Sequence, residues 1–114
     1  MGIENPETVD ALGIDPDTGD ALLVITDDLD WADPVAHLNA LQAKIGAYLG
    51  FIQTGQFEAA LPESAGRRRR VAVIQQFEPP IQIVPILDQL GDQLEAFDVD
   101  FSYGPLPGGY EAQA

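Results

Sequence analysis

The side chains best suited to acid–base chemistry lie in the first third of the chain. His37 is the only histidine, and two aspartates, Asp30 and Asp33, shortly precede it. As a general base, His37 would need a positioned nucleophile and an acidic group that orients its ring. The two serines, Ser64 and Ser102, lie in no Gly-x-Ser-x-Gly motif. We therefore favour a partly exposed helix histidine beside an acidic loop, and we expect no catalytic residue.

The aspartates in the same segment could instead bind a hard divalent cation. They are Asp27, Asp28, Asp30 and Asp33, and carboxylate oxygens are ligands that Ca²⁺ and Mg²⁺ prefer. The alternative is a helix cap next to a solvated turn, because an aspartate followed by Pro34 is typical of a helix start. We favour the cap, and we expect neither a bound metal nor a cofactor.

The charge of the chain excludes several classes of partner. Nineteen Asp and Glu against five Lys and Arg give a net charge of −14, whereas non-specific binding to nucleic acid or to an anionic membrane needs cationic surface. The absence of cysteine excludes disulfides and thiolate metal sites. Four consecutive arginines end at Arg70. We expect cross-strand ion pairs of Arg68 and Arg70 with one of three aspartates, Asp10, Asp98 and Asp100.

The N-terminal segment has no feature of a secretion signal. It is acidic and has neither a basic region nor a long apolar stretch. No window approaches the roughly 20 apolar residues of a membrane-spanning helix. We therefore expect a soluble cytoplasmic protein that binds neither membrane nor nucleic acid.

Hydrophobic periodicity predicts six elements in the order ββαβαβ. Apolar runs at 9–14 and 21–26 flank a segment in which Pro16 and Gly19 are typical of a hairpin turn. The remaining predicted elements are a helix from Pro34 to about Thr54 that stops at Gly55, a strand from Arg68 to Phe77, a helix from Pro85 and a strand at 99–103.

This order predicts an α+β or α/β two-layer fold. Right-handed crossovers would put both helices on one face of a four-stranded mixed sheet. We expect one acidic domain over residues 1–103. Residues 104–114 are rich in Gly and Pro and poor in large apolar side chains, so we expect a flexible tail.

The first predicted helix is almost without charge, since Lys44 is its only fully charged residue. Its broad apolar face consists of Val35, Leu38, Leu41, Ile45, Tyr48, Leu49 and Ile52. Its opposite face consists of small residues: Ala36, Ala40, Ala43, Ala47 and Gly50. Three interpretations stay open, namely an exposed face of good helix formers, packing against the second helix, and contact with another molecule.

Two further predictions concern the core. In the second helix, Leu87, Leu90, Leu94 and Phe97 are expected to face the core. Trp31, the only tryptophan, lies where the chain turns from strand to helix. We favour a core plug beneath the first helix over an exposed binding anchor.

Three stretches of the sequence carry a resemblance to a known family. They are Asp15-x-x-Thr18-Gly19, the corner Asp28-Leu29-Asp30-Trp31, and a helix motif running from His37-Leu38 through Gln42-x-Lys44-Ile45 and Tyr48-Leu49 to Gly55. With them, the chain resembles an uncharacterised family of small acidic bacterial α/β proteins, a domain of unknown function. The resemblance covers roughly residues 9–103 and implies no activity that could be transferred.

The sequence favours a non-enzymatic protein-interaction module. It would be a homodimer formed through the Ala/Gly face of the first helix, or it would bind a basic protein through its acidic rim. The alternative is an immunity- or antitoxin-like inhibitor that reaches a basic partner by electrostatic steering. A further alternative is a small metal-binding protein or enzyme that uses His37 and the Asp27–Asp33 segment. The candidate interaction residues are Trp31, His37, Ala36, Ala40, Ala43, Ala47, Gly50, Asp27, Asp28 and Asp30.

Overall fold

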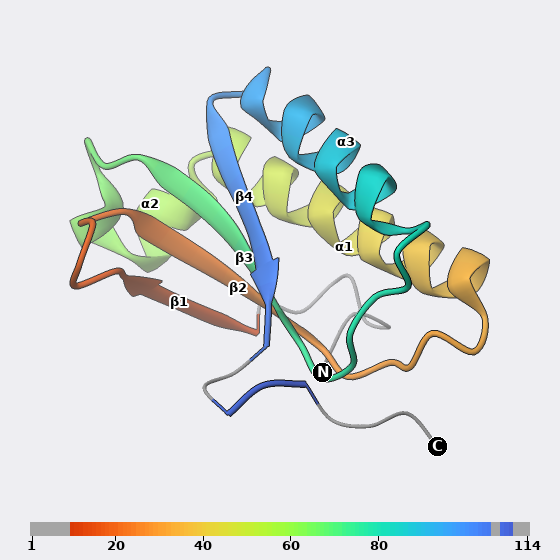
Figure 1. Ribbon diagram of the computed structural model, residues 1–114. Helices are drawn as coiled ribbons and strands as arrows, with labels where there is room; N and C mark the ends of the chain where they lie inside the picture. Colours follow the sequence, from red (N-terminus) through yellow and green to blue (C-terminus); the bar gives the residue numbers. More distant parts are fainter. Residues whose placement is uncertain (1–9, 106–107, 111–114) are drawn as a thin grey trace.

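The computed structural model describes residues 10–105 and 108–110, as Figure 1 shows. Its elements are β1 (Ala11–Ile14), β2 (Ala21–Asp27), α1 (Pro34–Gln53), α2 (Gln56–Ala60), the short 3₁₀ helix η1 (Pro62–Ser64), β3 (Arg69–Gln75), α3 (Val84–Glu95) and β4 (Val99–Gly104). The predicted order ββαβαβ is confirmed, with α2 and η1 inserted after α1.

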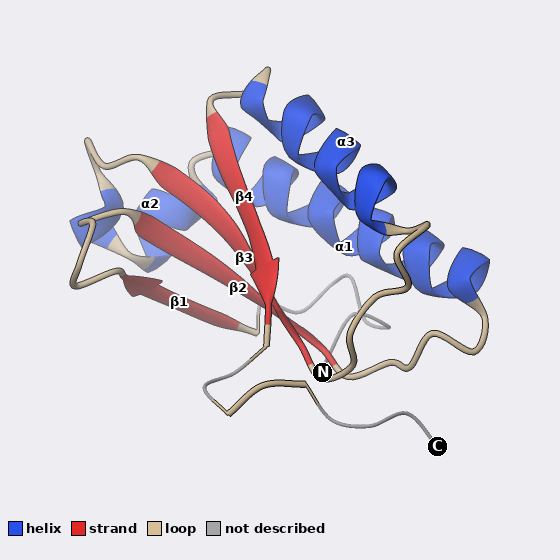
Figure 2. Cartoon of the chain, in the orientation of Figure 1, coloured by secondary structure: helices blue, strands red, loops and turns tan. Residues whose placement is uncertain are grey.

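The four strands form one mixed sheet in the order β1-β2-β3-β4. β1 and β2 are antiparallel, whereas β2, β3 and β4 are parallel. Each parallel connection contains a long helix, and Figure 1 and Figure 2 show α1 and α3 side by side on the same face of the sheet. Right-handed crossovers require this arrangement, and the predicted two-layer fold is confirmed.

The β1–β2 turn is the predicted hairpin. Asp15 Oδ1 accepts a hydrogen bond from the Asp17 N–H at 2.8 Å, and this bond lowers the pKa of the Asp15 carboxyl. The Gly19 N–H donates to the Asp15 carbonyl at 2.8 Å. Gly19 has a φ of +78°, a left-handed conformation that glycine adopts without steric cost.

The ends of α1 agree with the sequence prediction. Asp33 caps the helix by accepting a hydrogen bond from the Ala36 N–H at 3.2 Å, and Pro34 lies in the first turn. Gly55, with a φ of +81°, stops the helix. The chain then enters α2, whose Phe57 is fully buried. Five residues are too few for hydrophobic periodicity to reveal such a helix.

α3 begins one residue before the predicted Pro85 and buries one side. Leu87, Leu90 and Leu94 face the core as predicted. Phe97 is 53 % exposed, contrary to prediction, because it follows the last helical residue and has left the helical repeat. No helix among the described residues is both long and apolar enough to cross a membrane.

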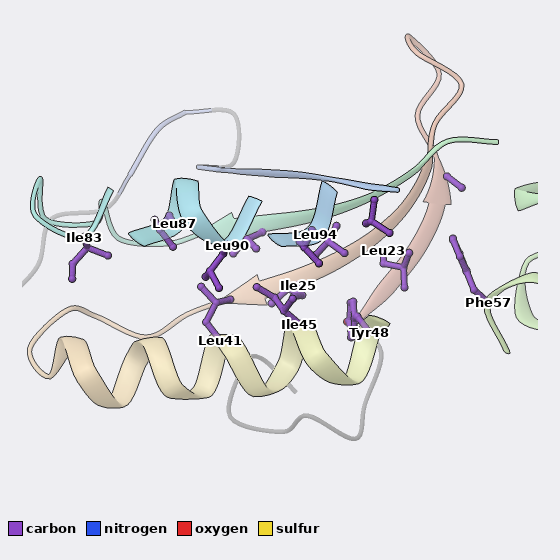
Figure 3. Packing of buried hydrophobic residues seen from close by; sticks show 14 of the residues in the cluster. Leu23, Ile25, Leu41, Ile45, Tyr48, Phe57, Ile83, Leu87, Leu90 and Leu94 are labelled. Atoms are coloured by element: carbon purple, nitrogen blue, oxygen red, sulfur yellow. The ribbon is translucent and has the colours of Figure 1, made fainter. Parts of the chain in front are cut away.

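The core lies between the sheet and the two long helices. Alternate residues of β2 and β3 are buried, including Leu23 and Ile25 in β2 and Val71 and Val73 in β3. Figure 3 shows these strands meeting apolar side chains of both helices. Of the two long helices, that view labels Leu41, Ile45 and Tyr48 of α1 and Leu87, Leu90 and Leu94 of α3.

The buried side of α1 differs in part from the predicted apolar face. Val35 is 68 % exposed, and Leu38, Leu49 and Ile52 are half-buried. The fully buried stripe is centred on Leu41 and contains polar residues that an apolar projection leaves out. Val35 lies far around the helix from that stripe, so it points to solvent.

The predicted tail starts one residue too early, because Gly104 still belongs to β4. Tyr110 donates a hydrogen bond to Gln75 Oε1 at 3.4 Å, and burial raises the pKa of the Tyr110 hydroxyl. Residues 106–107 and 111–114 of the predicted tail lie outside the described residues, as do residues 1–9, where we looked for a targeting signal.

Truncation of two apolar side chains of α1 tests which side of the helix is buried. Leu41→Ala is expected to lower the free energy of unfolding by about 2–5 kcal/mol, because it empties a fully buried site. Val35→Ala removes an exposed side chain and should change that free energy by less than about 0.5 kcal/mol. Urea denaturation followed by circular dichroism measures both values, and similar values would contradict the orientation of α1.

Candidate functional site

Two of the candidate residues, Asp27 and His37, form a buried hydrogen-bonded pair. Asp27 is the last residue of β2, and His37 lies in the first turn of α1. His37 Nε2 and Asp27 Oδ2 are 2.6 Å apart, and each side chain is 1 % exposed. His37 Nδ1 lies 2.8 Å from the backbone oxygen of Asp30. His37 is therefore buried rather than partly exposed as predicted, because the loop before α1 folds over its ring.

The partners of His37 determine what the pair can do. A carbonyl oxygen only accepts hydrogen bonds, so Nδ1 carries a proton. The second ring nitrogen, Nε2, is in contact with the Asp27 carboxyl. Both ring nitrogens are engaged inside the protein. The pair thus holds α1 on the end of β2.

Trp31 covers this pair. Its ring stacks on the His37 ring with 3.6 Å between centroids and 14° between planes. The Trp31 indole N–H donates to the Phe77 carbonyl at 3.3 Å, as a buried tryptophan requires. Trp31 is buried, which agrees with the core-plug interpretation and excludes an exposed anchor.

The other aspartates of this segment have separate roles. Asp30 Oδ1 accepts a hydrogen bond from the Ala32 N–H at 3.1 Å, Asp33 caps α1, and Asp28 is exposed. Among residues 10–105 and 108–110, no three His, Asp or Glu side chains converge as metal ligands would. The cap interpretation is confirmed at Asp33.

A small pocket of about 150 Å³ lies beside the Asp27–His37 pair. It is at the carboxyl ends of β2 and β3, where open α/β sheets commonly bind ligands. Its lining consists of Thr26, Asp27, Asp28, Ile74, Gln75, Gln76 and Gly109. Most ligand pockets enclose roughly 300–1,000 Å³, so this one admits only a few atoms.

A second buried polar cluster, which the sequence analysis missed, joins α1 to the hairpin. The Lys44 side chain is fully buried, and its Nζ donates to Asp10 Oδ1 at 3.0 Å. Asp10 Oδ2 accepts from the Thr26 N–H at 2.8 Å, and the Asp10 N–H donates to the Tyr48 hydroxyl at 2.8 Å. That hydroxyl donates to the Val24 carbonyl at 2.8 Å. Burial raises the pKa of Tyr48 to about 12.

The spacing of these polar residues could have indicated their burial. His37, Leu41, Lys44 and Tyr48 are separated by four, three and four positions, so they form one stripe along a helix. The small residues beginning with Ala36 repeat the same spacing one position earlier, about 100° around the helix. Counting only apolar residues hid the polar stripe.

Three of the four consecutive arginines form ion pairs. Arg68 donates to Asp98 at 2.5 Å and to the two oxygens of Asp100 at 3.0 and 2.7 Å. The cross-strand pairing predicted for Arg68 is confirmed, and the hydrogen bonds from Arg68 lower the pKa of Asp100. Arg69 pairs with Glu58 of α2 at 2.6 Å.

Arg70 has different partners from those predicted. It pairs with Asp15, at 3.4 Å, and with Asp20 in the β1–β2 turn. Asp10 binds Lys44 instead. β3 neighbours β2 rather than β1, which separates Arg70 from Asp10, and Arg68 already binds Asp98 and Asp100. Arg68, Arg69 and Arg70 are thus paired with carboxylates of the described residues, whereas Arg67 donates to the backbone oxygens of Glu63 and Gly19.

The Ala/Gly face of α1 lies on the outside of the molecule. Ala36, Ala43 and Ala47 are exposed, and Ala40 and Gly50 are half-buried. Packing of the three exposed alanines against α3 is therefore excluded. An exposed face of good helix formers and a contact with another molecule stay open.

A groove of about 350 Å³ separates α1 from α3. Its lining is Gln42, Ile45, Gly46 and Leu49 from α1 and Leu90, Gln93, Leu94 and Phe97 from α3 and the turn after it. The groove is mostly apolar, and the exposed Gly46 connects it to the Ala/Gly face.

Comparison with known proteins places the whole described fold in one family. The model of a family of unknown function, DUF6572, matches residues 1–106. The chain belongs to this family. The match spans every described strand and helix and both buried polar clusters, and the resemblance to a family of unknown function is confirmed. No curated protein and no solved structure matches the chain.

Removal of the Asp27 carboxylate tests the buried pair. Asp27→Ala should lower the free energy of unfolding by about 1–3 kcal/mol, because the buried His37 Nε2 loses its partner. Asp28→Ala removes the adjacent exposed carboxylate and should cost less than about 0.5 kcal/mol. Urea denaturation at neutral pH measures the difference. Equal effects of the two substitutions would show that the pair adds no stability.

The raised pKa of Tyr48 predicts how stability changes in alkali. The pKa of Tyr48 is about 12 in the folded protein, against an ordinary value of 10.0. The protonated hydroxyl therefore contributes to the free energy of unfolding in full below pH 10.0, and this contribution is lost as pH rises toward 12. Tyr48→Phe should be less stable at neutral pH, since it loses two hydrogen bonds, but should decline less steeply over this range. Urea denaturation across this pH range measures how the free energy of unfolding of each protein declines. An equal decline in the wild type and in Tyr48→Phe would contradict a buried Tyr48 hydroxyl.

Proposed function

We propose that this chain is a non-enzymatic interaction module that forms a homodimer through the outer side of its helical layer. The observation that carries the proposal is the exposed surface of α1. The chain has 19 acidic and five basic residues, yet the only charged side chain of this 20-residue helix is the buried Lys44. A solvated helix of such an acidic protein would ordinarily carry charges on its outer side.

The shape of this surface favours close packing of helices. Ala43, Gly46 and Ala47 are exposed, and a Cβ added at Gly46 or Gly50 would meet no described atom within 4 Å beyond the helix's own backbone. Small residues let the backbone of a second helix approach closely. The Ala/Gly face therefore suits a helix from another molecule.

The groove beside this face supplies the apolar contact that small residues lack. Phe97 is a large side chain, 53 % exposed, at one end of the groove. A twofold axis would place the Phe97 side chain of each copy against the groove of the other, which is the self-complementary arrangement of an isologous dimer. A second copy of this chain is therefore the occupant that we favour.

Electrostatics gives this dimer a characteristic salt dependence. Two copies that each carry a charge of −14 repel one another, and salt screens that repulsion, with a Debye length of about 8 Å at physiological ionic strength. The dimer should therefore persist or strengthen in high salt. A complex held by charges at the acidic rim would weaken instead.

One substitution tests the homodimer. Ala43→Glu places a charge in the middle of the Ala/Gly face and should convert the dimer to a monomer, with a loss of affinity of at least about tenfold. Ala59→Glu makes the same change at an exposed position of α2 and should leave the dimer intact. Light scattering after size-exclusion chromatography, over a range of concentration and salt, measures the mass of each protein. A wild-type chain that is monomeric throughout would overturn the proposal.

A further inference from the structure

β4 is the longer of the two free edges of the sheet. Its six residues, Val99–Gly104, pair with β3 on one side only. Within the described part of the chain, the β4 backbone makes no backbone hydrogen bond outside this pairing. Among the described residues, nothing pairs with the N–H and C=O groups that point outward, and these are the groups that a further strand would bind.

A groove of about 610 Å³ follows this edge, between β4 and α3. Aromatic side chains of β4, Phe101 and Tyr103, form part of its wall. Carboxylates form much of the rest: Asp88, Asp92 and Glu95 on α3 and Asp100 on β4. The groove thus combines an open strand edge, aromatic surface and negative charge.

The negative charge of the groove is only partly neutralised. Asp92 and Glu95 are exposed and make no ion pair with any residue that the structure describes. Asp100 is paired with Arg68. Arg70 is the only basic residue in the lining, and the carboxylates of the β1–β2 turn engage it. The groove therefore favours a cationic occupant.

We propose that the β4 edge binds an extended, arginine- or lysine-rich segment of a partner protein as a fifth strand. Strand addition to a free edge uses backbone hydrogen bonds for affinity and alternate side chains for specificity. Every second side chain of the added strand would point to the helix side of the sheet, toward Asp92 and Glu95. A cationic side chain there would be attracted to two carboxylates without ionic partners.

Charge also argues against a second copy at this edge. Pairing of β4 with β4 would bring together two edges on each of which Asp98 and Asp100 share the single cation of Arg68. Each edge therefore keeps an excess of negative charge, and like charges on neighbouring strands are destabilising. Acidic residues on an edge strand commonly prevent such self-association. The carboxylates of Asp92 and Glu95 attract a basic strand, so the edge discriminates between the two occupants.

This surface is separate from the proposed dimer interface. Leu90, Gln93 and Leu94 of α3 line the groove toward α1, whereas Asp92 and Glu95 line the groove toward β4. α3 thus divides the two surfaces. The inference goes beyond the proposed function, and a monomeric variant such as Ala43→Glu keeps the β4 edge unchanged.

A peptide with alternating arginine and valine, fluorescein-labelled and as long as β4, is the probe. Fluorescence anisotropy should show binding to the full chain. The same peptide with every backbone amide N-methylated keeps its charges but cannot donate strand hydrogen bonds, so it should bind at least about tenfold more weakly. Equal binding of the two peptides, or no binding of the first, would overturn the inference.

A pair of double variants separates the groove from the general charge of the chain. Asp92→Asn with Glu95→Gln should weaken peptide binding by about tenfold or more. Asp17→Asn with Glu63→Gln changes the net charge equally, at exposed positions away from the groove, and should weaken binding less than about twofold. Equal weakening would show attraction by net charge alone and overturn the inference. Ala43→Glu should bind the peptide as tightly as the wild type does. Peptide binding therefore tests the β4 edge independently of whether the chain forms the proposed dimer.

Discussion

The position of α1 on the sheet depends on buried hydrogen bonds made by one stripe of the helix. His37 contacts Asp27 at the end of β2. Two turns and three turns further on, Lys44 and Tyr48 hydrogen-bond to Asp10 and to the backbone of β2. Burying such groups is costly unless each finds its partner. Any rotation or shift of α1 would break several of these contacts together, so only one placement of the helix satisfies them.

That placement determines the outer surfaces as well. Because the stripe containing Lys44 faces the sheet, the neighbouring stripe of small residues faces outward, and the helix presents no charge to solvent. The acidic residues lie instead mainly in the β1–β2 turn, in the segment before α1, on α3 and at the start of β4. The molecule therefore has an uncharged helical surface on one side of α3 and an acidic strand edge on the other. These two surfaces suit partners of different chemistry.

Local sequence signals predicted most of the fold, whereas the polar core depended on strand order. Asp33 before Pro34 and the glycine at 55 marked the ends of α1, since capping depends on adjacent residues alone. The pair of Asp27 with His37 forms only when the loop after β2 turns back over the sheet. The partner of Lys44 lies 34 positions away in the sequence. No periodicity links such residues to their partners, and His37 was accordingly expected to be partly exposed.

The stack of Trp31 on His37 makes the junction of β2 and α1 optically distinct. Trp31 is the only tryptophan of the chain, so all indole fluorescence comes from this one place, where the ring contacts an imidazole at 3.6 Å between centroids. Separation of α1 from the strand ends would change this emission. Events at the outer side of α1 or at the edge of β4 would leave it unchanged. The chain thus carries an intrinsic probe that distinguishes opening of its core from occupation of its surfaces.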